Sequence, residues 1–298
     1  MFKARFSIGF CLILAAGAVQ AEAAEQAWVA RYDGPGHGKD NAQALTVDAG
    51  GNAYVTGFSD GGDGNYDFAT VKYDDSGNQE WVARYDGDIR GADWVRDVAV
   101  GAEGGVYVTG SSAGEGTGFD FATVKYDADG SQLWVSRYDG PAHGDDRVKA
   151  LTVDASGNAY VTGDSAVPGG RTESVTIKYG PDGDLLWVAR SGPSGVGQSL
   201  AAVAVDADGN VYVAGSALPR PGNTDFVTIK YDPAGEPLWT AYRDWSAHDD
   251  ARYLAIDVEG SVYLAGDFVS RAENSDKAAH QDIGVVKYGP DGQELWSI

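Results

Sequence analysis

One phrase recurs six times in this chain of 298 residues, and its spacing limits the possible folds more than any single motif does. The tryptophan of the phrase occurs at Trp28, Trp81, Trp134, Trp187, Trp239 and Trp296. Consecutive tryptophans are separated by 53, 53, 53, 52 and 57 residues. A period near fifty residues is typical of repeat architectures, in which each unit is stable only when its neighbours stack on it.

Each repeat contains four short runs rich in Val, Thr, Tyr and Phe. In the first repeat these runs are Trp28–Tyr32, Ala44–Asp48, Ala53–Gly57 and Phe68–Tyr73. Such runs predict β-strands, and no segment after residue 24 has the pattern of an amphipathic helix. The second run alternates large aliphatic with small residues, so each sheet has a bulky face and a small face that can stack. Four-stranded sheets stacked around an axis form a β-propeller. We therefore predict an all-β, five-bladed β-propeller of four-stranded antiparallel blades.

The connections between the runs fall into two classes. Tight Asp-x-x-Gly turns such as Asp48–Gly51 and Asp74–Gly77 follow the second and fourth runs, and glycine supplies the left-handed residue that such turns need. The other two connections are longer and vary between repeats. Because strand direction alternates, the tight turns lie at one end of the sheets and the variable loops at the other. Any binding site is expected among the variable loops.

The repeat also resembles a known group. Asp40–Gly57 and Asp67–Trp81 follow the pattern D-x-A-x-A-hydrophobic-x-V-D-x-x-G-N-x-Y-V-x-G and D-F-x-x-x-K-Y-D-x-x-G-x-x-x-W. This pattern is similar to the bacterial SBBP-type beta-propeller repeat, over residues 26–298. The resemblance implies that the ALTVD run is the innermost strand and the WVARY run the outermost. It implies no particular chemistry, because propellers host many functions.

Six tryptophan phrases for five complete blades leave one strand in excess. Trp28–Asp33 and Leu295–Ile298 compete for the outer edge of the last blade. We predict that the N-terminal strand pairs there, so that the N- and C-terminal strands close the ring and leave no open edge. A truncated six-blade array is the alternative. Residues 25–298 would form one domain of five repeats, at about 28–80, 81–133, 134–186, 187–238 and 239–298.

Residues 1–24 have the features of a secretory signal peptide. Lys3 and Arg5 precede an apolar run from Phe6 to Val19, and a small-x-small cleavage pattern ends at Ala21. We therefore expect a secreted or periplasmic protein. No second apolar run follows, so we expect no membrane insertion.

The composition excludes some partners and chemistries. The formal net charge is −22, which argues against nucleic acid and anionic membranes as partners and suits cation binding. The single cysteine, Cys11, lies in the predicted signal peptide, so the mature chain would have no thiol and no disulfide. We expect a monomer.

An acidic residue recurs eight positions before the end of each innermost strand, except in the fourth repeat, where Gln198 replaces it. The four aspartates are Asp40, Asp93, Asp146 and Asp249. We predict that they lie near the mouth of the axial channel. There they could bind Ca²⁺ through oxygen ligands, hold the two carboxylates of a glycosidase, or simply cap their own loops.

A second acidic position precedes the recurring lysine of each repeat by five residues. Its occupants are Asp67, Asp120, Glu173, Asp225 and Asp282. Hairpin spacing predicts cross-strand ion pairs of Asp67 with Arg84 and of Asp120 with Arg137. The lysine stems are expected to lie over tyrosine rings.

Histidines and two tryptophans are candidate ligand-binding residues in the variable loops. His37, His248 and His280 could approach one another if the ring closes, and could then bind a transition metal. Trp94 and Trp245 lie outside the recurring tryptophan position and could stack on sugar rings or anchor a partner. Exposed loop histidines and local packing of the tryptophans are the plainer interpretations.

The sequence favours a non-enzymatic module that presents variable loops on one face to a protein or a glycan, with Ca²⁺ as a candidate stabilising ion. The familiar nucleophile, phosphate-binding and zinc motifs are absent from the sequence. The alternative is a propeller-type glycan hydrolase or lyase that uses carboxylates at the channel mouth. Carboxylates bonded to loop amides would favour the binding module, and two unpaired carboxylates about 6–10 Å apart would favour the enzyme.

Overall fold

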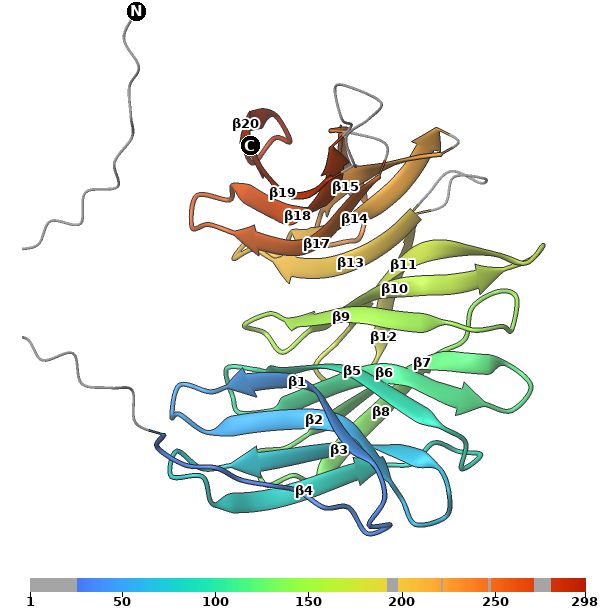
Figure 1. Cartoon of the computed structure of the whole chain (residues 1–298), viewed down its shortest axis with the longest axis vertical. Helices are drawn as coiled ribbons and strands as arrows, with labels where there is room; N and C mark the ends of the chain where they lie inside the picture. Colours follow the sequence, from blue (N-terminus) through green and yellow to red (C-terminus); the bar gives the residue numbers. More distant parts are fainter. Residues whose placement is uncertain (1–25, 192–197, 221, 246–247, 271–279) are drawn as a thin grey trace, which may run out of the picture.

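The computed structural model describes residues 26–191, 198–220, 222–245, 248–270 and 280–298. It confirms an all-β protein with twenty strands in five four-stranded antiparallel sheets, which we number 1 to 5 in chain order (Figure 1). The strands are β1 (Asp40–Val47), β2 (Ala53–Asp60), β3 (Tyr66–Tyr73), β4 (Gln79–Tyr85), β5 (Asp93–Val100), β6 (Val106–Gly114), β7 (Gly118–Tyr126), β8 (Gln132–Tyr138), β9 (Arg147–Val153), β10 (Ala159–Val167), β11 (Arg171–Tyr179), β12 (Leu185–Ser191), β13 (Gln198–Val205), β14 (Val211–Arg220), β15 (Asn223–Tyr231), β16 (Pro237–Arg243), β17 (Asp249–Ile256), β18 (Val262–Ser270), β19 (His280–Tyr288) and β20 (Glu294–Ser297).

Each sheet is a simple meander whose strands pair in chain order. The tight turns form as expected: in the first, the Asp48 carboxylate accepts the backbone N–H groups of Gly50 and Asn52, and Gly51 has a φ of 85°.

The first strand is longer than predicted. It begins at Asp40 rather than Ala44, because a β-bulge between Ala42 and Ala44 lets it continue along β2.

The sheets stack through opposite faces, as the bulky and small faces predict. The first strand of each sheet contacts the first strand of the next, which places β1, β5, β9, β13 and β17 innermost. At the first junction, Val98 and Val108 of sheet 2 pack in one buried cluster with Tyr54 and Phe68 of sheet 1. Burying a large aliphatic or aromatic side chain contributes about 1.5–3 kcal/mol, so stacking supplies the stability that a single sheet lacks.

The outer strands are joined by a repeated contact in which the recurring tryptophans pack against the next sheet. The Trp81 ring of sheet 1 lies against Gly130 of sheet 2, and its Nε1 donates to the carbonyl of Ala128 at 3.0 Å. Trp134, Trp187 and Trp239 make the same bond to the next sheet. The lysines also behave as predicted: the ammonium of Lys125 lies 4.9 Å from the centre of the Tyr107 ring.

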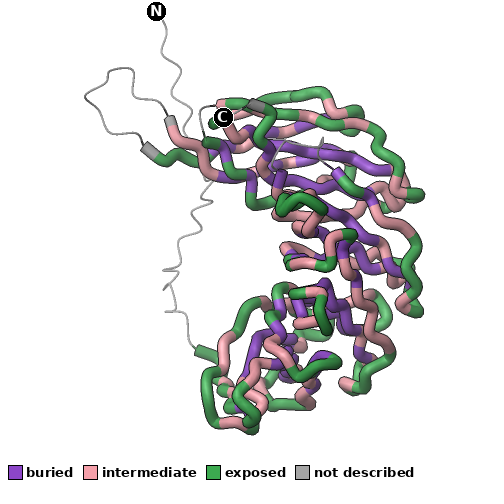
Figure 2. Tube along the Cα trace, turned by 90° about the vertical axis from the view of Figure 1, so that its right-hand side faces the viewer, coloured by how far each residue is buried: buried purple, intermediate pink, exposed green. Residues whose placement is uncertain are grey.

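The five sheets follow a curved path, and the Cα trace bends into a C (Figure 2). Sheets 1 and 5 lie at its two ends (Figure 1). Within the described residues no strand of sheet 1 pairs with a strand of sheet 5, so closure of the ring is not confirmed. The expected strand at Trp28–Tyr32 does not form, because this segment pairs with no strand in the described structure. Sheet 5 instead contains its own fourth strand, β20.

Candidate functional site

In four of the five sheets the recurring aspartate begins the innermost strand or directly precedes it, as Asp146 precedes β9, and accepts a backbone N–H from the preceding loop. Asp40, Asp93 and Asp146 accept from Gly34, Gly87 and Gly140 at 3.1, 2.8 and 2.6 Å. Asp249 accepts from the backbone of Trp245 at 2.7 Å. Each carboxylate therefore holds its own variable loop, the plainest of the roles that the sequence allowed.

The second acidic position makes the predicted cross-strand ion pairs. Asp67 and Arg84 approach to 2.7 Å, and Asp120 and Arg137 to 2.8 Å. The arginine also crosses to the preceding outer strand, because Arg137 donates to the hydroxyl of Tyr85 at 3.0 Å. Two consecutive repeats are thus linked through one guanidinium.

Stacking brings the two acidic positions together across each of three junctions, with a third aspartate that the sequence analysis missed. We call each group an acidic triad. One oxygen from each carboxylate lies within 4.8 Å of the other two. Within the described residues the triads are Asp67–Asp86–Asp93, Asp120–Asp139–Asp146 and Asp225–Asp244–Asp249.

Each triad combines β3 or its equivalent, the end of the fourth strand and the first strand of the next sheet. All three positions lie at the variable-loop end of the sheets. The missed residue is the aspartate that follows Arg-Tyr in the WVARYDG phrase, and its recurrence at Asp86 and Asp139 was a signal that could have found it. None of the triads contains two of Asp40, Asp93, Asp146 and Asp249.

The first triad carries an electrostatic cost. Asp93 is fully buried, and burial is the main cause that raises the pKa of its carboxyl to about 6, with the charges of Asp86 and Asp67 adding to the rise. Burial followed by the charge of Asp67 also raises the pKa of Asp86. Carboxylates forced together out of water disfavour ionisation.

Several buried carboxylate oxygens of the triads have no hydrogen-bond donor. These are Oδ1 of Asp67 and Asp93 in the first triad and Oδ1 of Asp120 and Asp139 in the second. Asp67 and Asp120 are 6% and 5% exposed. Converging carboxylate oxygens are the ligands that hard divalent cations such as Ca²⁺ prefer, so the residues fit such an ion.

The junction between sheets 3 and 4 has no acidic triad among its described residues. Glu173 pairs with Arg190 at 2.5 Å. Gln198 occupies the position of the loop-holding aspartate, and its backbone carbonyl accepts from the hydroxyl of Ser174 at 3.0 Å. The two sheets nevertheless stack, with Leu200 and Val211 in a shared buried cluster with Tyr160.

The two candidate tryptophans both pack against aromatic rings at a junction between two sheets, to different extents. Trp94 lies 4.9 Å from the Phe58 ring and 5.4 Å from the Tyr66 ring, and it keeps 36% of its surface exposed. Trp245 stacks on Phe268 at 5.6 Å and meets Phe226 edge-on at 4.9 Å. Trp94 is therefore the better placed of the two to contact a ligand.

The two candidate histidines whose side chains are described lie beside different sheets. His37 is exposed and its ring bonds to Asp33 at 2.8 Å, which raises the pKa of the imidazole. His248 is exposed on another sheet, where its backbone carbonyl accepts from Val269. The side chain of His280 lies outside the described part of the structure, as do residues 1–24 with the predicted signal peptide.

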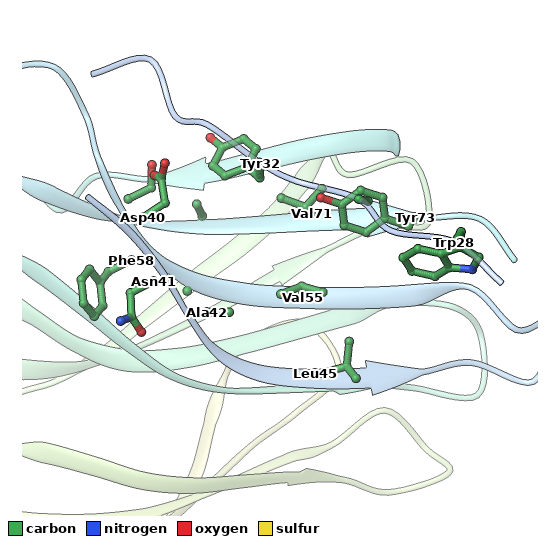
Figure 3. A pocket seen from close by; sticks show the side chains of 14 residues that line it. Trp28, Tyr32, Asp40, Asn41, Ala42, Leu45, Val55, Phe58, Val71 and Tyr73 are labelled. Atoms are coloured by element: carbon green, nitrogen blue, oxygen red, sulfur yellow. The ribbon is translucent and has the colours of Figure 1, made fainter. Parts of the chain in front are cut away.

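A pocket of about 380 Å³ lies on the bulky face of sheet 1 (Figure 3). It is lined by Leu45, Val55, Val71 and Tyr73 of the sheet and, on one side, by Trp28. At the other junctions this face is covered by the preceding sheet. The pocket therefore marks an uncovered end of the stack.

Sequence comparison places the chain beside parts of two larger proteins. No family model matches it. The regulatory protein FlaEY of Caulobacter vibrioides is 33% identical over 175 residues, which is 54% of this chain and 17% of that protein. An uncharacterised WD repeat-containing protein, L264, of Acanthamoeba polyphaga mimivirus is 30% identical over 116 residues, which is 33% of this chain and 8% of that protein. The chain thus spans less than a fifth of either relative's length.

Two solved structures share the fold. A protein of unknown function from Dyadobacter fermentans has a TM-score of 0.51 at 12% identity, over 86% of this chain and 93% of that chain. A polysaccharide lyase, an ulvan lyase bound to -[GlcA(1-4)Rha3S]-, has a TM-score of 0.50 at 12% identity, over 85% of this chain and 69% of that chain. No helix in the described residues is long and apolar enough to cross a membrane. At these identities the likeness concerns fold alone: the chain has a propeller-like architecture of five four-stranded antiparallel sheets.

Proposed function

We propose that this protein is an exported, non-enzymatic binding module that presents variable loops on one propeller face to a protein or glycan, with divalent cations such as Ca²⁺ holding those loops. The observation that carries the proposal is the state of the carboxylates at the loop end. Each innermost aspartate is bonded to a loop amide, and Asp93 and Asp146 are fully buried. Buried carboxylates bonded to the backbone can position loops, whereas a catalytic carboxylate must reach its substrate.

The triads support the cation part of the proposal. Three carboxylates within 4.8 Å repel one another unless protons or a cation intervene. The buried oxygens without donors in the first two triads supply ligands, and the carboxylates already connect the variable loops to both neighbouring sheets. A bound divalent ion would stabilise all three carboxylates in the charged state and fix the loops that they hold.

A propeller-type glycan hydrolase or lyase remains the alternative. The likeness to an ulvan lyase is one of fold, at 12% identity. We also propose that the ring is closed, with the N-terminal strand paired to the C-terminal sheet.

The cation part is tested by thermal melting in Ca²⁺ and in EDTA. At a hundredfold excess over Kd, one occupied site adds about 2.7 kcal/mol, which corresponds to a Tm rise of about 5 °C in a domain of this size. Asp93→Asn should reduce this rise. Glu173→Gln, an acidic position outside the triads, should not. A Tm that neither Ca²⁺ nor EDTA moves would remove the cations from the proposal.

The binding part is tested on a glycan array and by protein capture from the medium, followed by one loop variant. Trp94→Ala should weaken binding of any identified ligand at least tenfold. Arg147 occupies the equivalent strand position in sheet 3, so Arg147→Ala is the matched control. Equal binding by both variants and the natural protein would exclude Trp94 from the ligand site.

A further inference from the structure

Residues 28–34 lie on sheet 1 as a fourth strand of a preceding sheet would. The Trp28 ring lies against Gly77, as Trp81 lies against Gly130. Arg84 donates to the Tyr32 hydroxyl at 3.1 Å, as Arg137 does to Tyr85. These contacts reproduce the junction between sheets 1 and 2, but the three inner strands that should accompany the segment are missing from its side.

Among the described residues, no other sheet covers the bulky face of sheet 1. Leu45 is 64% exposed, whereas its equivalents Val98 and Leu151 in sheets 2 and 3 are 6% and 8% exposed. The pocket of about 380 Å³ lies over this face, beside Trp28 (Figure 3). The face is therefore built to receive a sheet.

Sheet 5 has the complementary exposed face. Phe68, Phe121 and Phe226 are completely buried because each inserts against a glycine of the next sheet: Gly110, Gly163 and Gly266. The equivalent residue of sheet 5 is Ile283, which is 75% exposed. The equivalent glycine of sheet 1 is Gly57, which lines the pocket.

The outer edge of β19 is only partly used. β20 pairs with Val286, Lys287 and Tyr288, and Ile298 adds one further backbone pair with Val285. In sheet 1 the equivalent pairing between β3 and β4 extends further, as far as Phe68. The part of β19 from residue 281 to 284 therefore has no fourth-strand partner in the described structure.

We propose that residues 28–32 pair with β19 of the same chain, displacing β20, and that sheet 5 thereby covers sheet 1. The repeated register places Trp28 opposite Lys287, Val29 opposite Val286 and Tyr32 opposite Ile283. In this register Arg31 reaches Asp282 as Arg84 reaches Asp67. Arg31 and Asp282 are both exposed and of opposite charge.

The same chain is the preferred occupant for two reasons. The trace already bends into a C (Figure 2), and sheets 1 and 5 lie at the two ends of this curved path (Figure 1). Joining two surfaces of one chain also has an effective concentration in the millimolar range or above, which a second copy does not reach in dilute solution. A head-to-tail contact with a second copy would use the same surfaces and is distinguished below.

Closure would also build a fourth acidic triad. Asp282, Asp33 and Asp40 are the equivalents of Asp67, Asp86 and Asp93, and they are divided between the two ends of the chain. Oδ1 of Asp40 is already buried without a hydrogen-bond donor. A divalent cation would then favour closure, an extension that rests on the proposed cation binding.

Disulfide competition tests the exchange of strands. In a Cys11→Ser background, the triple variant Val29→Cys/Val286→Cys/Ser297→Cys lets position 286 bond to either competing strand. The exchanged register predicts a bond between positions 29 and 286, and the register of β20 predicts one between 286 and 297. After oxidation in EDTA, peptide mass spectrometry should find the first in at least tenfold excess, within single chains on a non-reducing gel.

The outcomes separate the hypotheses. A dominant 286–297 bond would overturn the strand exchange, and a 29–286 bond between two chains would make the occupant a second copy. Because the experiment runs in EDTA, a failure of cation binding leaves the predicted bond intact. Conversely, a failed exchange leaves the Ca²⁺-dependent Tm rise of the three internal triads intact. If the exchange holds, Ca²⁺ should increase the 29–286 yield, and Asp33→Asn should abolish that increase.

Charge reversal gives a second test that leaves the buried residue Val286 unchanged. Arg31→Glu or Asp282→Arg alone should open the ring and raise the radius of gyration measured by X-ray scattering. The double variant should restore the natural value, and Arg31→Lys should have little effect. A radius that none of the variants changes would contradict the predicted Arg31–Asp282 contact.

Discussion

The junction between sheets 1 and 2 and the junction between sheets 3 and 4 use the same outer contacts and different loop-end contacts. At both, a tryptophan Nε1 donates to a carbonyl of the next sheet: Trp81 to Ala128 and Trp187 to Pro233. Only the first carries an acidic triad in the described structure. Since the second stacks without one, the triads are not needed for stacking. Buried like charges that stacking does not require support the proposed cation binding at the triads.

The largest expected effect comes from removing the guanidinium beside a triad. Arg137→Met leaves the buried Asp120 without its partner and should lower the free energy of unfolding by about 3–5 kcal/mol. Arg190→Met, at the junction without a triad, breaks a pair in which Arg190 is 37% exposed and should cost about 1 kcal/mol or less. Urea unfolding in EDTA measures both. Equal losses would remove the distinction between the junctions.

The pH dependence of Asp93 should be the next largest effect. Its folded-state pKa of about 6 exceeds the ordinary value of 3.8, so between these values the folded state keeps a proton that the unfolded state has lost. Stability therefore falls as pH rises through this window, by about 3 kcal/mol in total. Urea unfolding in EDTA at pH 4 and pH 7 covers most of this window, so the fall should be larger by about 2 kcal/mol in the natural protein than in Asp93→Asn. If the natural protein and Asp93→Asn had the same dependence of unfolding free energy on pH, burial would not raise the pKa of the Asp93 carboxyl.

The smallest effect concerns the loop beside the second triad. His143 bonds to Asp139 at 2.5 Å and is exposed, and this bond raises the pKa of its imidazole above 6.5. Because the His143 ring is exposed, His143→Gln should leave the free energy of unfolding almost unchanged. An NMR titration should find the titration midpoint of the His143 imidazole above pH 6.5. Asp139→Asn should move this midpoint back toward 6.5. If the natural protein and Asp139→Asn gave the same midpoint, Asp139 would not interact with His143 and would contact only the other two aspartates of its triad.

The repeat period was sufficient to predict the number of sheets, the strand order and the Arg84–Asp67 pair, because these follow from spacing within one unit. The triads join residues of two units. Asp67 and Asp93 belong to separate sets in the sequence, and their proximity depends on how far one sheet rotates on the next. Closure depends on the sum of those rotations, which no pattern of residues specifies. The packing of Trp94 against Phe58 likewise arises only between sheets.

The outer contact also bears on how such a chain can change in evolution. At each of the four junctions, one carbonyl of the following turn accepts from both a tryptophan and a lysine, as Pro181 does from Trp134 and Lys125 at 2.9 Å each. The acceptor is a backbone atom, so the residue at that position can vary between Ala128 and Pro181. In-frame gain or loss of one whole unit would recreate the same joint at the new boundary. Recombination can therefore change the number of blades without compensating substitutions in the outer strands.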